Sequence, residues 1–151
     1  MMYKTHVAFA IFLCLILSKF FNFDVMATTL ISVFSTSIPD IDHTNSKISR
    51  TKLFRPISFL VSLISRHRGI FHGILMMAVL SLIVFRFFPK FLLGFCIGYG
   101  AHLFADLLTV QGIMIFWPSK YLIKGFIKTG GVLEYFFLLF CVAGSLFIVL
   151  L

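Results

Sequence analysis

The sequence predicts an all-α integral membrane protein, a helical bundle of about five spans (four to five) with an amphipathic helix at the membrane interface. Hydrophobic residues make up 60% of the 151 residues, charged residues only 12%, and the mean hydropathy is +1.08. A water-soluble domain of this composition would have too little polar surface to cover itself. In hydrocarbon every backbone polar group must be paired within the chain, which favours helices. No linker or repeat divides the sequence, so we expect residues 1–151 to form a single domain.

Long apolar runs give the expected spans. The last three approach the roughly 20 residues that a helix needs to cross about 30 Å of hydrocarbon. The first two are shorter, so they form either a hairpin of complete spans or a pair that enters the membrane without crossing it. Between Arg55 and Arg66 the apolar residues gather on one side, which is typical of an amphipathic helix on a membrane surface. The five runs are Val7 to Phe21, Val25 to Ile38, Ile70 to Phe88, Phe91 to Val110 and, as the C-terminal span, Val132 to Leu151.

Basic residues are distributed unequally between the two sides of this bundle. If all five runs span, ten of the 13 Lys and Arg residues lie on the side of the N-terminus and three on the other side. Basic residues are enriched in cytoplasmic loops. We therefore expect a protein integral to the cell (inner) membrane, with its N-terminus in the cytoplasm. No small-residue cleavage site follows the first run, which predicts an uncleaved anchor rather than a signal peptide. The net charge of +8 fits anionic lipid headgroups as partners, and because sidedness accounts for the basic residues, nucleic-acid binding is not expected.

Three short clusters hold most of the His and Asp residues. They are Pro39-Asp40-Ile41-Asp42-His43, His67-Arg68-Gly69-Ile70-Phe71-His72 and His102-Leu103-Phe104-Ala105-Asp106. Since the chain has only five His and five acidic residues, this gathering departs from random scatter. In the expected topology the clusters also share the cytoplasmic side and about one depth. The sequence therefore predicts a cytoplasmic metal site whose candidate ligands are His6, Asp40, Asp42, His43, His67, His72, His102 and Asp106.

The third cluster carries the clearest geometry. His102 and Asp106 are four residues apart in a helix, so their side chains share one face at about 5–6 Å between Cβ atoms, and one cation could take both. Thr109 continues this stripe. Gly98, one turn before His102, would let another helix or a ligand approach closely. Ionisable residues inside an apolar run are costly and tend to be functional.

The other two clusters leave alternatives open. Asp40 and Asp42 would point the same way in an extended segment after Pro39 and could share an ion, but either one could equally be a helix cap or a solvated loop charge. An interfacial histidine such as His6 often only anchors a helix end. Arg68 lies four residues before His72, which indicates an arginine near the metal that faces an anionic substrate.

Taken together, the motifs resemble a known family. The three clusters resemble those of the YdjM-like membrane-bound, predicted metal-dependent hydrolases of bacteria and archaea. Further residues carry the same resemblance: Gly98-Tyr99-Gly100-Ala101, Thr109, Gln111-Gly112 and Trp117-Pro118. The resemblance extends from about His6 to Pro118 and implies a membrane fold, a metal site and hydrolysis. Gly73 departs from it, because a Ser is expected there. The His102-x-x-x-Asp106 pair is also similar to the metal-binding helix motif of zinc-dependent phospholipase C and P1-type nucleases.

We therefore expect a membrane-bound metal-dependent hydrolase, a phosphoesterase that acts on an amphiphilic or lipid substrate at the cytoplasmic face through a metal-activated water. The mixed His/Asp set suits Zn²⁺, with Mn²⁺ or Fe²⁺ as alternatives. The expected catalytic residues are Asp42, which with Asp40 is a candidate proton acceptor, and Arg68, which would neutralise developing negative charge. Two alternatives belong to other classes: an ion or small-solute transporter that uses the His/Asp cluster, and a non-catalytic membrane protein held together by metal.

Overall fold

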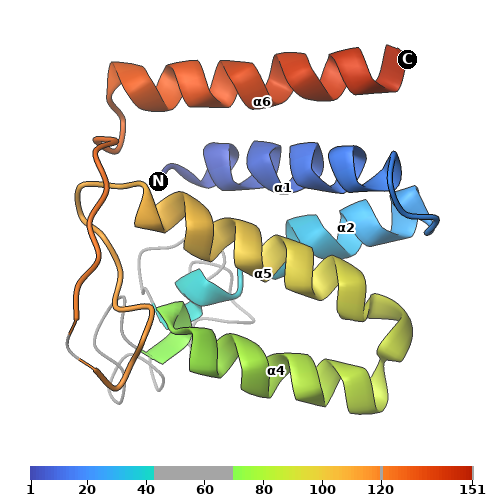
Figure 1. The fold of residues 1–151 in the computed structure, drawn as a ribbon, viewed down its shortest axis with the longest axis horizontal. Coiled ribbons are helices and arrows are strands. Elements are labelled where there is room, and N and C mark those ends of the chain that lie inside the picture. The colour runs from blue at the N-terminus through green and yellow to red at the C-terminus, as the bar shows by residue number, and fades with distance from the viewer. Residues whose placement is uncertain (43–69, 120, 151) are drawn as a thin grey trace, which may run out of the picture.

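The computed structural model describes residues 1–42, 70–119 and 121–150, and within them the regular secondary structure is helical, with a long non-helical connection between α5 and α6. The α-helices are α1 (Tyr3–Ser18), α2 (Val25–Ser35), α4 (Ile74–Phe87), α5 (Leu92–Leu107) and α6 (Val132–Leu150) (Figure 1). Three 3₁₀ turns, η1 (Pro39–Asp42), η2 (Ile70–His72) and η3 (Pro89–Phe91), lie between them. The described residues contain no β-strand, only two isolated bridges in the α5–α6 connection. The all-helical prediction is confirmed for this part of the chain, and the expected amphipathic helix at 55–66 lies outside it.

Local signals set the helix boundaries. The Asp24 carboxylate caps α2 by accepting a hydrogen bond from the backbone N–H of Ala27 at 3.0 Å. Pro39 starts η1 after α2 has ended, so the segment that carries Asp40 is a 3₁₀ turn and not the extended segment expected from the sequence. A proline fixes its own φ near the helical value, which suits the first position of a helical turn. Gly73 precedes α4, so the expected span from Ile70 begins instead with η2.

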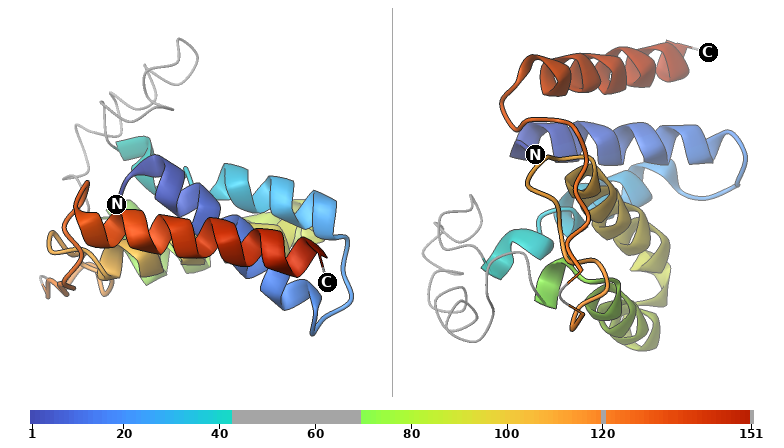
Figure 2. Two further views of the ribbon diagram at one scale, coloured as in Figure 1. Left: turned by 90° about the horizontal axis from the view of Figure 1, so that it is seen from above. Right: turned by 60° about the vertical axis from the view of Figure 1, so that its left-hand side comes forward.

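Helix α5 is the centre of the bundle. It packs against α1, α2 and α4, whereas α6 lies alongside α1 (Figures 1 and 2). Small side chains bring α1 and α5 close together: Ala10 of α1 meets Ala101 and Ala105 of α5 in a buried cluster that also includes Phe9 and Cys141. Because α5 is surrounded, most of its length is buried, and polar groups placed on it are removed from solvent.

Two glycines set the position of α2 on α5. A Cβ atom at Gly98 would lie 2.1 Å from the carbonyl oxygen of Ser32, and one at Gly94 would lie 2.7 Å from that of Thr28. Neither distance is possible for a real side chain, so the two backbones touch where α5 has no side chain. Small residues four apart are the usual way for membrane helices to approach closely. The contact predicted from Gly98 is thus made by α2.

The helix lengths bear on membrane crossing. Among the described residues, α6 is the one helix that is both long and apolar enough to span, with 19 residues and only 11% of its apolar window buried inside the protein. The helices α1, α2 and α4 are apolar but have 16, 11 and 14 residues, below the ~20 of a straight complete span. The helical character of the predicted bundle is therefore confirmed for the described residues, α6 is a candidate span, and the count of five spans stays a prediction.

The polar clusters meet at one end of the bundle. The start of α1, the end of α2, the turn before α4 and the end of α5 all lie at the end that is on the left in Figure 1. The described members of the clusters therefore gather at one end of the bundle, while their common depth in the membrane stays a prediction.

Candidate metal centre

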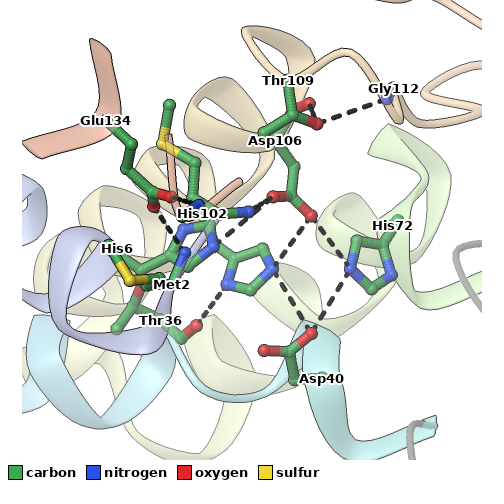
Figure 3. A network of polar contacts seen from close by, with 12 residues as sticks. Met2, His6, Thr36, Asp40, His72, His102, Asp106, Thr109, Gly112 and Glu134 are labelled. Atoms are coloured by element: carbon green, nitrogen blue, oxygen red, sulfur yellow. Dashed lines mark hydrogen bonds and ion pairs between the residues drawn. The ribbon is translucent and has the colours of Figure 1, made fainter. Parts of the chain in front are cut away.

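Five ionisable side chains from four segments converge at this end (Figure 3). His6 comes from α1, Asp40 from η1, His72 from η2, and His102 with Asp106 from α5. Four of them are almost completely buried, with exposed fractions of 2%, 0%, 1% and 2% for His6, His72, His102 and Asp106. Asp40 is the accessible member, with 29% of its side chain exposed. Among the residues that the structure describes, the centre is therefore closed on most sides and accessible at Asp40 of η1.

Four of these side chains direct one atom each toward a common point. Nε2 of His72 lies 3.7 Å from Oδ1 of Asp40 and 3.6 Å from Oδ2 of Asp106. Nε2 of His102 lies 3.8 Å and 3.7 Å from the same two oxygens. A four-coordinate Zn²⁺ with bonds of about 2.0–2.1 Å separates its ligand atoms by about 3.3–3.4 Å. The four nitrogen-to-oxygen distances are therefore a few tenths of an ångström wider than a bound zinc ion would hold them, and Asp40, His72 and His102 form a group whose donor atoms all lie within 4.8 Å of one another.

The backbone of α2 fixes the orientation of the His102 ring. Nδ1 of His102 donates a hydrogen bond to the carbonyl oxygen of Thr36 at 2.6 Å. A carbonyl can only accept, so Nδ1 carries the proton and Nε2 presents its lone pair. This Nε2 is buried and has no hydrogen-bond partner. A second ring nitrogen bonded to a backbone carbonyl is the usual arrangement for histidines that bind metals.

Asp106 contacts two sets of nitrogen atoms. Its Oδ2 faces His72 and His102, whereas its Oδ1 lies 3.4 Å from Nε2 of His6 and accepts a hydrogen bond from the α-amino group of Met1 at 2.6 Å. The His6 ring stacks on the His102 ring with their centroids 4.0 Å apart and an interplanar angle of 5°. His6, His102 and Asp106 thus form a second group whose donor atoms lie within 4.8 Å of one another.

The donor set fits a divalent cation. Imidazole nitrogens and carboxylate oxygens together suit Zn²⁺, Mn²⁺ and Fe²⁺. If both imidazoles are neutral, the carboxylates of Asp40 and Asp106 bring two negative charges into a largely buried place. The α-ammonium group of Met1, 2.6 Å from Asp106, offsets one of them, so the set stays negative and attracts a cation. Buried charges without such compensation are strongly unfavourable. The buried lone pair of His102 Nε2 is the observation that most directly fits the binding of a cation.

Two groups that position the candidate ligands were not predicted from the sequence, Glu134 and the carbonyl group of Thr36. Glu134, completely buried near the start of α6, accepts hydrogen bonds from the backbone N–H of Met2 and, at 2.6 Å, from that of Gly130. It thereby ties α6 to the beginning of α1, one turn before His6. A lone carboxylate in an apolar run was an available signal for Glu134. The Thr36 carbonyl has no such signal, because any residue type supplies a backbone oxygen.

The candidate residues divide into two groups. The structure brings together His6, Asp40, His72, His102 and Asp106. His43, His67 and Arg68 lie outside the described residues, as does the side chain of Asp42.

Thr109 does not continue the ligand stripe. Its hydroxyl donates to the carbonyl oxygen of Asp106 at 2.7 Å and accepts from the N–H of Gly112 at 3.2 Å. Thr109 therefore stabilises the end of α5, three residues after the candidate ligand Asp106.

Comparison with known proteins places this architecture in a family. The family described as YdjM inner membrane protein matches residues 1–150. The chain is similar to YvsG of Bacillus subtilis, with 33% identity over 135 residues that cover 87% of this chain and 83% of YvsG. It is also similar to the inner membrane protein YdjM of Escherichia coli and that of Shigella flexneri, each 28% identical over 97 residues. Those alignments cover 60% of this chain and 48% of YdjM, so the chain spans about half the length of YdjM. No solved structure matches the chain.

Proposed function

The chain belongs to the YdjM family of inner membrane proteins, and we propose that it is a metal-dependent hydrolase that cleaves a phosphoester of an amphiphilic or lipid substrate at the cytoplasmic membrane face. The single observation that carries this proposal is the convergence of the Asp40, His72, His102 and Asp106 donor atoms at one end of a membrane protein. A set of buried ionisable groups in such an apolar chain is costly, which supports a functional role.

The four residues named above would hold the metal. His6 contacts the other oxygen of Asp106, Oδ1, which faces away from His72 and His102. Zn²⁺ is the preferred ion, and Mn²⁺ or Fe²⁺ the alternatives. When bound, a divalent cation supplies Lewis acidity that lowers the pKa of water and polarises a phosphoryl oxygen. In the hydrolysis, the water oxygen forms a bond to phosphorus, the ester P–O bond breaks, and the leaving alcohol takes up the proton that the water loses.

The residues of this chain have separable tasks. Asp40 lies on the open side, where water and substrate reach the centre, so its carboxylate is placed to accept a proton from an incoming water. The Thr36 carbonyl keeps the His102 ring in one tautomer. From the sequence, Asp42 is a second candidate base, and Arg68 would bind the phosphoryl oxygens with its bidentate guanidinium. The proposed cytoplasmic location rests on the excess of Lys and Arg on the N-terminal side.

A second candidate function has its own supporting observation. Four protein donor atoms are enough to complete a tetrahedral shell, and closed four-ligand shells are characteristic of structural zinc sites. In that case the metal would stabilise the bundle without catalysis. The exposure of Asp40 favours the catalytic alternative, because a structural site has no need of an open side.

The test combines metal analysis with a substrate panel. We expect the protein, purified in detergent, to retain about one or two equivalents of a divalent metal and to hydrolyse at least one phosphoester of the panel. His102→Ala should lose both properties while it still inserts into membranes, and Leu93→Ala, at a half-exposed site on the same helix, should keep both. Tightly held metal without hydrolysis of any phosphoester would favour the structural role, and ion flux in liposomes would favour a transporter.

A further inference from the structure

An apolar groove lies between α2 and α4, with α5 as its floor. Its volume is about 300 Å³, within the range of small-ligand sites. Apart from the serine Ser35, its walls are hydrocarbon, and its lining includes Ile31, Phe34, Ile38, Leu80, Val84 and Phe95. With so few polar groups, the groove fits a hydrocarbon chain and not a polar headgroup.

One end of this groove lies close to the open side of the metal centre. Ile38 lines the groove and stands two residues before Asp40, the one exposed member of the ligand set. Ile38 also packs against the buried cluster that contains Tyr99 and Leu103, next to His102. On α5 the groove reaches Phe95, seven residues before His102, which corresponds to about 10 Å along the helix axis. The groove therefore leads away from the centre along α5.

The far part of the groove opens laterally. Phe34 of α2 and Ile83 of α4 line it with 61% and 49% of their surfaces exposed, and the exposed Phe88 and Phe91 line its far end. In a membrane protein, these exposed apolar side chains face lipid. A hydrocarbon tail could thus enter from the bilayer without crossing a polar surface.

We propose that this groove holds the hydrocarbon tail of the substrate, with the phosphoester at the Asp40 side of the metal centre. The inference rests on the proposed function and narrows its substrate class to amphiphilic phosphoesters that have at least one alkyl or isoprenoid tail. The group to be cleaved lies at the open side, where water attacks phosphorus, the ester P–O bond breaks and the leaving alcohol receives the proton.

A larger apolar groove elsewhere does not serve the same purpose. It has a volume of about 560 Å³ and lies between α1 and α6, where it is lined by residues such as Lys4, Val7 and Leu138. On α1 these residues occupy the face opposite His6, which points into the metal centre. A lipid bound there would have its headgroup on the wrong side of α1.

The inference is tested with two substitutions on α4 that introduce the same tryptophan side chain. Val84 lines the groove, so Val84→Trp fills it, whereas Leu82 is 68% exposed and Leu82→Trp adds the same side chain outside. For hexadecyl p-nitrophenyl phosphate we expect Val84→Trp to raise KM roughly tenfold, the loss expected when about two methylenes no longer find a buried site. The methyl ester should be cleaved equally well by both variants, and metal content should stay at the wild-type value.

A labelling experiment on the unaltered protein avoids any dependence on how Val84→Trp folds. Hexadecyl phosphate with a diazirine at the end of its tail should label peptides from residues 31–38 and 80–95. Labelling of residues 138–146 instead, or equal KM values for both esters in the two variants, would overturn the inference and leave the proposed hydrolase intact. If the probe labels the groove of a metal-loaded protein that cleaves no phosphoester, the proposed function is wrong. The tail in the groove would then not belong to a substrate.

Discussion

Nδ1 of His102 on α5 donates a hydrogen bond to the carbonyl oxygen of Thr36, at the end of α2, with a distance of 2.6 Å. This bond makes the orientation of a candidate ligand depend on how two helices are aligned. The alignment is set one turn earlier, where Gly98 lies against Ser32. Helix packing and ligand geometry are therefore coupled, and a change at the glycine contact should be detectable at the metal centre.

Gly98→Ala should disturb both packing and metal binding. Its Cβ atom would lie 2.1 Å from the Ser32 carbonyl oxygen, so α2 must move, at a cost of about 1–3 kcal/mol for overpacking. The shift would also displace the Thr36 carbonyl from His102. We expect a lower melting temperature in detergent and weaker metal retention, measured by thermal unfolding and by competition with a chelator.

Gly100→Ala is the matched control for this substitution. It lies two residues away on the same helix, and its Cβ atom would meet only the terminal methyl group of Met77, at 3.7 Å. Alanine favours a helix by up to about 1 kcal/mol over glycine, so this variant should be as stable as the wild type or more so. Equal effects of the two substitutions would show that the α2–α5 contact does not position the ligand.

Glu134 should matter for the metal centre although it holds no candidate ligand atom there. Glu134→Ala would leave the N–H groups of Met2 and Gly130 without their acceptor, at a cost of about 1–3 kcal/mol. The beginning of α1 would loosen, and His6 with it. We expect a lower melting temperature and a moderate loss of metal affinity, with Glu134→Gln in between because its amide keeps one acceptor oxygen. If Glu134→Ala unfolds at the wild-type temperature, the hydrogen bonds of Glu134 contribute nothing to the bundle.

The helices could be predicted from the apolar runs, and all five converging residues were among the candidate ligands predicted from the sequence, mainly for one physical reason. Charged and imidazole groups inside apolar runs are costly, so each of them marks either a site or a boundary. This reasoning located His72, His102 and Asp106, and the order of the runs placed them at one end. The same reasoning applies to Glu134, which was missed because the last run was interpreted only as the C-terminal span.

Other features depend on three-dimensional packing and could not be read from the residue pattern. The 3₁₀ turn at Asp40 replaces the extended segment that was expected there. The acceptor on Thr36 is a backbone atom, which no side-chain pattern reveals. The stacking of His6 on His102 requires the close α1–α5 approach at Ala10 and Ala101, whose register is decided by packing and not by periodicity.

The expected sidedness can be tested with reporter fusions. Ten of the 13 Lys and Arg residues lie on the N-terminal side of the five apolar runs. Fusions within residues 44–52 should therefore read as cytoplasmic, and fusions after Phe88 and after α6 as external. An external reading at residues 44–52 would place the metal centre on the opposite face. A cytoplasmic reading after α6 alone would instead indicate an even number of spans, with the location of the centre unchanged.

The two carboxylates of the centre should differ in how much each contributes to metal affinity. Asp106 is 2% exposed and its oxygens face three histidines, so Asp106→Asn places an amide group against nitrogen donors that cannot move away. We expect metal affinity to fall by on the order of a hundredfold or more. Asp40 is 29% exposed, so in Asp40→Asn a water can replace the lost ligand and the fall should be nearer tenfold. Titration of the metal-free variants with Zn²⁺ measures both values, with membrane insertion as the check on folding. Affinities that fall equally, or an order in which Asp40 matters more, would mean that the ion does not lie at the point between His72 and His102 to which both carboxylates are directed.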